Sequence, residues 1–169
     1  MYQPQELSAV LLRQNIITSE QMEAISKELG ASLKGFEAYL LDHKLLDEEK
    51  LAAAKAELYH LPYKNLIDQD IKDAAVYFLN KDIAKNYKII CFYKDYKVAK
   101  IGLVDFDLKA MEAVNFLAQG QNLQIEYNLI SEHSFRELFK RYERMEEEIS
   151  TALDVKAKTR QEEGLSVDK

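Results

Sequence analysis

The chain has few of the residues that usually form cross-links, turns and linkers. Its 169 residues include no tryptophan, one cysteine, two prolines and five glycines. So few prolines and glycines leave little room for long disordered linkers, except at the charged carboxyl end from residue 156 to 169. The single cysteine, Cys91, lies within an apolar run, where a buried hydrophobic side chain is favoured over a reactive thiol.

Positive charge and long apolar runs are also scarce. The formal net charge is −6 and the pI is near 5.2, which opposes non-specific binding to nucleic acids or anionic membranes. No apolar run approaches the roughly 20 residues that span a bilayer, and the amino terminus has neither the basic start nor the apolar stretch of a signal peptide. We therefore expect a cytoplasmic protein that binds no nucleic acid and does not insert into a membrane.

Motifs for catalysis and cofactor binding are missing. The sequence contains neither Gly-x-x-x-x-Gly-Lys-Ser/Thr nor Gly-x-Gly-x-x-Gly, so it offers no recognisable phosphate cradle, and we expect neither ATP hydrolysis by this chain nor a cofactor. His43, His60 and His133 lack metal-ligand spacing, so no catalytic or metal site is predicted. Asp105 and Asp107 resemble paired carboxylates, but their place between a strand and a helix favours Asp107 as an N-cap and Asp105 as a contact of the helix dipole.

What the chain does contain is one pattern that occurs twice in its first 60 residues, at an offset of 29 residues. Each copy has a Leu-Leu pair, a second apolar pair and an acidic helix start. The pattern predicts two helical hairpins, and therefore four short helices between residues 5 and 60. Thr18 with Gln21 predicts a capping box, Asp47 predicts an N-cap, and Gly30 marks a helix end. Helices this short require packing against each other or against the rest of the chain.

The period changes after Leu58, and the later residues predict a small sheet with helices. Short helices are expected over 74–79 and 82–87, strands over 88–93, 96–104 and 122–130, a helix over 108–119, and a long helix after Ser131 with an apolar stripe that continues to Ile149. This order predicts an α+β fold: the tandem helical repeat followed by a three-stranded sheet with helices on one face. We divide the chain into a repeat subdomain (1–60), an α/β subdomain (61–145) and a charged helical extension or linker (146–169).

Two further features have a structural and a functional interpretation. Glu146, Glu147 and Glu148 could form an acidic docking patch, although a solvated helix face is the commoner explanation. The abundance of tyrosine is at most a weak indicator of a binding face, because tyrosine is enriched at interfaces but is also common in cores. The tyrosines in question are Tyr39, Tyr59, Tyr63, Tyr77, Tyr93, Tyr96 and Tyr127.

The order and spacing of several segments, taken together, are specific. Besides the repeat, these segments are residues 61–63, 83–90, 97–107, 114–120 and 135–142. Together they resemble the amino-terminal domain of type II secretion and type IV pilus assembly ATPases, over residues 5–143. The resemblance implies a domain that precedes a hexameric ATPase core and couples it to the cytoplasmic face of the secretion or pilus machine.

Some members of that family bind cyclic di-GMP through two copies of a motif with an arginine, two glycines, an apolar pair and a closing glutamine. The resemblance places the candidate ligand residues at Ser8, Leu11, Leu12 and Asn15 in the first copy and at Glu37, Leu40, Leu41 and Lys44 in the second. The apolar pairs are kept, whereas the arginine, glycine and glutamine positions are all replaced. Glu6 stands at one arginine position and Glu37 at one glycine position, so negative charge lies where a dianion would bind. We expect cyclic di-GMP binding to be lost.

The favoured function is therefore a non-catalytic adaptor or regulatory domain that docks a partner protein of the machine. The expected partner is the cytoplasmic domain of an inner-membrane platform protein, which would hold the chain at the inner membrane peripherally. An ATPase core of the same polypeptide is a second partner if the chain is a fragment. The competing hypothesis is a divergent cyclic di-GMP receptor, and a third, an enzyme with an unfamiliar site, would need clustered groups with perturbed pKa values.

Overall fold

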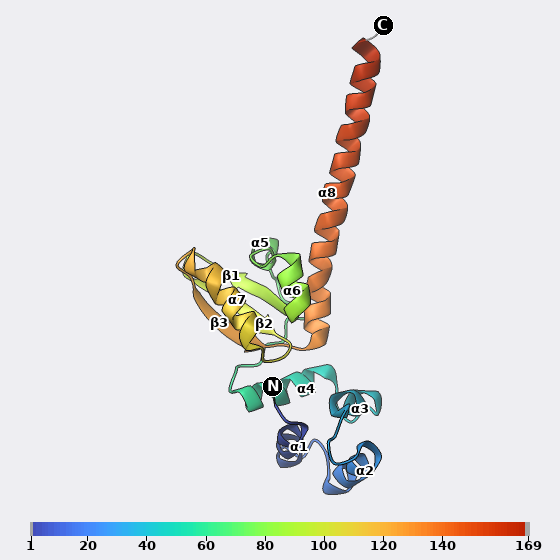
Figure 1. The fold of residues 1–169 in the computed structure, drawn as a ribbon, viewed down its shortest axis with the longest axis vertical. Coiled ribbons are helices and arrows are strands. Elements are labelled where there is room, and N and C mark those ends of the chain that lie inside the picture. The colour runs from blue at the N-terminus through green and yellow to red at the C-terminus, as the bar shows by residue number, and fades with distance from the viewer. Residues whose placement is uncertain (1, 168–169) are drawn as a thin grey trace.

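The structure, a computed structural model, describes residues 2–167, with side chains as far as residue 164. Its helices and strands follow one another from a helical repeat through a small sheet to a long carboxyl-terminal helix (Figure 1). In chain order they are α1 (Pro4–Arg13), α2 (Ser19–Leu29), α3 (Phe36–Asp42), α4 (Glu48–Tyr59), α5 (Asp73–Val76), α6 (Lys81–Tyr87), β1 (Ile89–Lys94), β2 (Val98–Leu103), α7 (Leu108–Gln119), β3 (Gln124–Leu129) and α8 (Glu132–Val167). The predicted α+β fold is confirmed.

The four helices of the repeat form as the local sequence predicts. The Thr18 side chain accepts from the Gln21 N–H while the Gln21 side chain accepts from the Thr18 N–H, which completes the capping box of α2. Asp47 accepts from the Lys50 N–H at 2.7 Å and caps α4 in the same way. Gly30, at φ 84°, ends α2. The four helices share one apolar core, to which both copies contribute.

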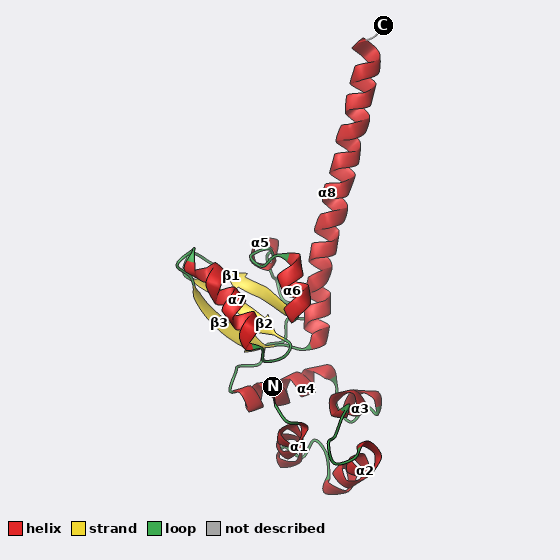
Figure 2. Ribbon diagram, in the orientation of Figure 1, coloured by secondary structure: helices red, strands yellow, loops and turns green. Residues whose placement is uncertain are grey.

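The sheet has the strand order β1-β2-β3. Strands β1 and β2 form an antiparallel hairpin with a bulge between Cys91 and Tyr93, and β2 pairs in parallel with β3 from Val98 opposite Gln124 to Leu103 opposite Leu129. Because parallel neighbours need a crossover connection, α7 lies between β2 and β3 in the chain. Figure 2 shows α7 lying across one face of the sheet.

The expectation that helices cover one face of the sheet is wrong, because β1 is buried on both sides. Ile89 and Cys91 pack into the core that includes Val114 of α7, whereas Ile90 and Phe92 pack into a second core. The second core is completed by side chains of α6 and α8, namely Ala84, Phe135, Leu138 and Tyr142. A strand buried on both faces reads as a continuous apolar run and not as an alternation, as residues 89–92 do.

Helix α8 has 36 residues, and its far half projects away from the rest of the molecule (Figure 1). Ser131, after which the long helix was predicted, caps it by accepting from the Ser134 N–H at 2.9 Å. The apolar stripe is buried from Phe135 to Tyr142, but Ile149 is 51% exposed. The stripe therefore continues along α8 beyond the part of the helix that packs against the rest of the chain. None of the helices within residues 2–167 is long and apolar enough to span a bilayer. The proposed division at residues 60 and 145 stays a prediction.

Helix α4 connects the repeat to the sheet because it belongs to two cores. Leu51 and Ala54 pack in the core of the repeat, whereas Ala56 packs in the core beneath α7. Three of its buried residues are alanines, which suits a helix that neighbours approach from two sides.

Candidate functional site

The two copies of the candidate motif share a left-handed turn after their first helix. Asn15 has φ 57° and Lys44 has φ 55°. The next residue donates its N–H five residues back, from Ile16 to Leu11 at 2.9 Å and from Leu45 to Leu40 at 3.0 Å. This is the Schellman motif, whose left-handed position usually holds glycine. The left-handed backbone conformation at the second glycine position of the motif is therefore retained, although asparagine and lysine replace the glycines.

The leucines of the motif form the core. Leu11 and Leu40 are fully buried, and Leu12 and Leu41 are half-buried at its edge. The structure therefore explains the two Leu-Leu pairs by packing and by the carbonyl groups that close the turns.

The first glycine position of the motif differs between the copies. Ser8, at this position on α1, is buried, and its hydroxyl donates to the Gln5 carbonyl oxygen at 2.8 Å. Glu37, at the equivalent position on α3, accepts a hydrogen bond from the Tyr2 hydroxyl and lies 3.1 Å from Lys55 Nζ. The structure brings Glu37 into a polar cluster, whereas Ser8, Asn15 and Lys44 lie outside it.

Lys55 is the centre of this cluster and is 5% exposed. Its Nζ lies 3.1 Å from Glu37 and 3.2 Å from Asp105, so one ammonium group joins the repeat to the loop after β2. The Tyr59 hydroxyl donates to Asp105 at 2.8 Å. Burial, followed by the hydrogen bond to a carboxylate, raises the pKa of both Tyr2 and Tyr59, so both hydroxyls stay protonated donors.

Asp105 therefore corrects one prediction. It was expected to favour the dipole of the following helix, but its carboxylate is turned to Lys55 and Tyr59 across the junction. Asp107 does cap α7, since its side chain accepts from the Lys109 N–H at 2.9 Å and the Ala110 N–H at 3.4 Å. The two aspartates have separate structural roles and do not form a carboxylate pair.

A groove follows the junction between the repeat and the sheet. One depression of about 260 Å³ is lined by side chains of α3, α4 and the start of α8, among them Leu41, Leu51 and Glu132. Adjoining depressions extend past Glu37 and Asp105 on either side. The groove is therefore partly apolar at its base and rich in paired charges at its rim.

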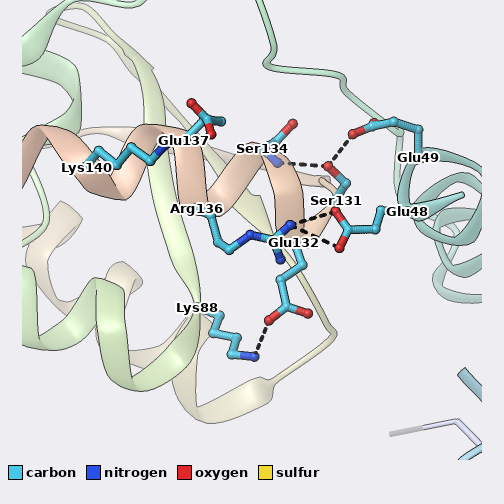
Figure 3. A network of polar contacts seen from close by, with 9 residues as sticks. All are labelled: Glu48, Glu49, Lys88, Ser131, Glu132, Ser134, Arg136, Glu137 and Lys140. Carbon is cyan, nitrogen blue, oxygen red and sulfur yellow. Dashed lines mark hydrogen bonds and ion pairs between the residues drawn. The ribbon is translucent and has the colours of Figure 1, made fainter. Parts of the chain in front are cut away.

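At the first depression of the groove, a second set of polar contacts connects α4 to the start of α8 (Figure 3). Arg136 donates to both carboxylate oxygens of Glu48, at 3.1 and 3.0 Å, in a bidentate ion pair. Glu49 accepts from the Ser131 hydroxyl and from the Tyr63 hydroxyl. Burial raises the pKa of Tyr63, and the hydrogen bond to Glu49 adds to it.

The charges of the groove do not suit an anionic ligand. Lys55 is already neutralised by two carboxylates, and the described part of the chain has no buried side-chain nitrogen or oxygen without a hydrogen-bond partner. No group of three or more His, Cys, Asp or Glu side chains in that part could hold a metal ion. Residues 1–60 carry six basic and ten acidic side chains. The arrangement serves best as a junction between two packed parts, beside a groove that a protein segment could enter.

Lys55 was not identified from the sequence, and Tyr59 was named only among the tyrosines that weakly indicate a binding face. Comparing the two copies could have identified them, because the equivalent positions of the first copy hold Ser26 and Gly30, which could not make these contacts. A lysine and a tyrosine at the second copy's equivalent positions indicate a role that the first copy lacks.

The similarity of this chain to known proteins is found when structures are compared and not when sequences are compared. No family model matches the sequence, and no curated protein matches it significantly. The fold is similar to that in the structure of MshE with cdg (cyclic di-GMP), with 21% identity and a TM-score of 0.63, over 80% of this chain and 97% of that chain. It is also similar to the N-terminal domain of XpsE, with 15% identity and a TM-score of 0.51, over 84% of this chain and 96% of that chain. The chain has the fold of these domains.

Proposed function

We propose that the chain is the amino-terminal adaptor domain of a type II secretion or type IV pilus assembly ATPase, and that it docks a partner protein of that machine. The proposed partner is the cytoplasmic domain of an inner-membrane platform protein, which would bring the chain to the inner membrane. We further propose that the chain itself is non-catalytic and that any ATP hydrolysis belongs to a separate core.

The observation that carries this proposal is the shared fold with MshE over 97% of that chain, in a sequence whose motifs resemble the same family. The groove adds physical support. Its charged groups are paired with one another, which suits a preformed surface for a protein more than a site that must neutralise a dianion. Preformed surfaces change little when they bind, so the described arrangement is a fair starting point for docking.

The test is a titration of the full chain with the cytoplasmic domain of the platform protein from the same organism. We expect saturable binding, and no phosphate release when the chain alone is incubated with ATP and Mg²⁺. Absence of binding at high micromolar concentration would overturn the docking role, and sustained ATP turnover would overturn the non-catalytic assignment.

A divergent cyclic di-GMP receptor is the second candidate. It is favoured by the left-handed turns at Asn15 and Lys44, which keep the backbone of the motif although its glycines are gone. Against it stands Glu37, whose carboxylate faces the groove and whose partner Lys55 is shared with Asp105. We expect the charge of Glu37 to repel the phosphates of the ligand.

Calorimetry with cyclic di-GMP decides between the two candidates. We expect no binding heat from the wild type, and partial recovery of binding in a Glu6→Arg/Glu37→Gly variant. Low-micromolar binding by the wild type would establish the receptor function. The Glu6→Arg/Glu37→Gly variant at raised salt is the control for non-specific charge effects.

A further inference from the structure

The tip of the β1–β2 hairpin presents aromatic and basic side chains together. We define the hairpin patch as Tyr93, Lys94, Tyr96, Lys97 and Lys100. Tyr96 is 81% exposed and Tyr93 is 46% exposed, which is unusual for such large side chains on a strand and turn. The patch lies at the end of the sheet opposite the junction, because β2 runs from this tip toward the loop of Asp105 (Figure 1).

The lysines of the patch are held over the aromatic rings. Lys97 Nζ lies 5.3 Å from the ring centroid of Tyr96, and Lys100 Nζ lies 5.2 Å from that of Tyr93. These distances are within the range of cation–π attraction. Lysines held in this way lose less conformational entropy on binding than free ones, so the patch is partly preorganised.

The acidic group within the hairpin is occupied by local hydrogen bonds. Asp95 accepts from the N–H groups of Lys97 and Val98, at 2.7 and 2.8 Å, and from the Tyr93 hydroxyl at 3.0 Å. These hydrogen bonds lower the pKa of Asp95. The Lys100 ammonium is 3.9 Å from Glu126, the outer limit of an ion pair. The patch therefore presents a net positive charge to solvent.

A depression of about 380 Å³ adjoins the patch. Ala74, Ala75 and Phe92 supply its apolar lining, and its charged lining residues are Lys72 and Lys94 together with Asp70 and Asp95. An apolar depression beside lysines and exposed tyrosines has the composition of a protein interface, in which an apolar anchor is surrounded by a charged rim.

Charge distinguishes this surface from the repeat and from the far half of α8. Residues 146–169 carry four basic and seven acidic side chains, and residues 1–60 are acidic as well. An acidic partner would thus be repelled by the repeat and by α8 but attracted to the hairpin. A nucleic acid is less suitable, because three lysines neutralise few phosphates and a longer strand would meet the acidic regions.

We propose that the hairpin patch is a docking surface, distinct from the groove, for an acidic protein segment that places an apolar side chain in the adjoining depression. The proposal rests on the proposed docking function and adds a second contact surface and the chemistry of the segment that it binds. The ammonium groups pair with the carboxylates of the segment, while Tyr93 and Tyr96 pack against its apolar side chains.

The experiment compares Lys94→Glu/Lys97→Glu with wild type, using the full chain. The matched control is Lys85→Glu/Lys109→Glu, which makes the same charge change at exposed lysines of α6 and α7. In titrations with the platform protein's cytoplasmic domain, we expect the hairpin variant to lose roughly tenfold or more in affinity and the control less than about threefold. Wild-type affinity should also fall as salt rises. Equal losses in both variants, or no loss in the hairpin variant, would overturn the patch while leaving the docking function intact.

Further probes separate the two proposals. If the wild type does not bind the platform domain, the docking function fails, and the patch is decided by a soluble copolymer of glutamate and tyrosine. Salt-sensitive binding of the copolymer that the hairpin variant loses supports the patch, and equal binding by both proteins overturns it. Hairpin-dependent binding to oligothymidylate or to phosphatidylserine vesicles that is tighter than binding to acidic protein would overturn the assignment to a protein segment.

Discussion

Helices α2 and α4 occupy equivalent places in the two copies of the repeat but have different surroundings. Helix α2 buries Ile25 and is otherwise largely open to solvent, whereas α4 buries residues that face both the repeat and the sheet. At the positions 29 residues apart, α2 has Glu23, Ser26 and Lys27 where α4 has Ala52, Lys55 and Ala56. A few substitutions on one helix face thus turn a free surface into a junction.

The shared sequence pattern specifies the helical hairpin but not the surface against which each hairpin packs. The capped helix starts and left-handed turns recur in both copies, because each depends on residues three to five positions apart. The junction belongs to the second copy, whose α4 meets the sheet, and α8 completes it through Arg136. Exchanging residues between the two copies therefore tests the hairpin and the junction separately.

The largest effect is expected from Ala56→Lys, which places the first copy's residue in the second. Ala56 is 3% exposed in the core beneath α7, so a lysine there must bury its charge or push the helices apart. We expect a loss of about 3 kcal/mol in the free energy of unfolding by urea. The reciprocal Lys27→Ala, on exposed α2, should change it by less than about 0.5 kcal/mol. Comparable effects of the two substitutions would show that α2 and α4 are equally buried.

Removing the charge of Lys55 is expected to cost less. Lys55→Met leaves Glu37 and Asp105 without their shared cation, and because both carboxylates are partly exposed the loss should be about 2 kcal/mol at neutral pH. Adding Glu37→Gln and Asp105→Asn should restore most of that loss, and Ser26→Lys on α2 should be nearly neutral. Thermal melts of the four proteins measure this, and a triple variant no more stable than Lys55→Met would refute a charge-based junction.

The sequence predicted the parts of the fold that depend on near neighbours. The Thr18–Gln21 box and the Asp47 and Asp107 caps depend on residues within one helical turn, and α7 extends over residues 108–119 as predicted. Leu11 and Leu40 also lie at helical spacing with Leu7 and Phe36, and they are buried in the core of the repeat.

The junction could not be predicted in this way, because its contacts join distant residues. Tyr59 and Asp105 are 46 positions apart, and nothing near Asp105 distinguishes a helix-dipole role from an ion pair. Likewise, the apolar stripe of α8 has the same period at Ile149 as at Leu138, but packing ends where α5, α6 and the sheet end. The period of apolar residues in the sequence shows which residues of a helix could be buried, whereas tertiary contacts decide which of them are buried.

A smaller effect should separate the left-handed turns of the two copies. The side chain of Lys44 is sterically strained at φ 55°, whereas glycine is not. Because glycine also raises the conformational entropy of the unfolded chain, Lys44→Gly should stabilise the folded chain by only about 0.5 to 1 kcal/mol. Asn15→Gly should gain less than about 0.5 kcal/mol, because asparagine tolerates this region. Urea unfolding of both variants measures the difference. Destabilisation by Lys44→Gly would mean that the lysine side chain contributes contacts that outweigh the strain.

The smallest effect is expected from an ion pair that does not cross the junction. Lys88 and Glu132 are 2.7 Å apart and 53% and 44% exposed, so Glu132→Gln should cost less than about 0.5 kcal/mol. The hydrogen bond from Lys88 lowers the pKa of Glu132. Since the folded-state pKa is lowered, this contribution is present above the unfolded pKa of about 4.3 and is lost as pH falls through the folded-state value.

The difference in stability between wild type and Glu132→Gln should therefore shrink from pH 7 toward pH 3 and also shrink in high salt. The Glu48–Arg136 pair, bidentate and at the junction, provides the comparison. If Glu48→Ser, which installs the residue that the first copy has at Ser19, costs no more than Glu132→Gln, the polar contacts of α4 with α8 add nothing beyond ordinary surface pairs. The junction would then be held by its alanine packing and by Lys55.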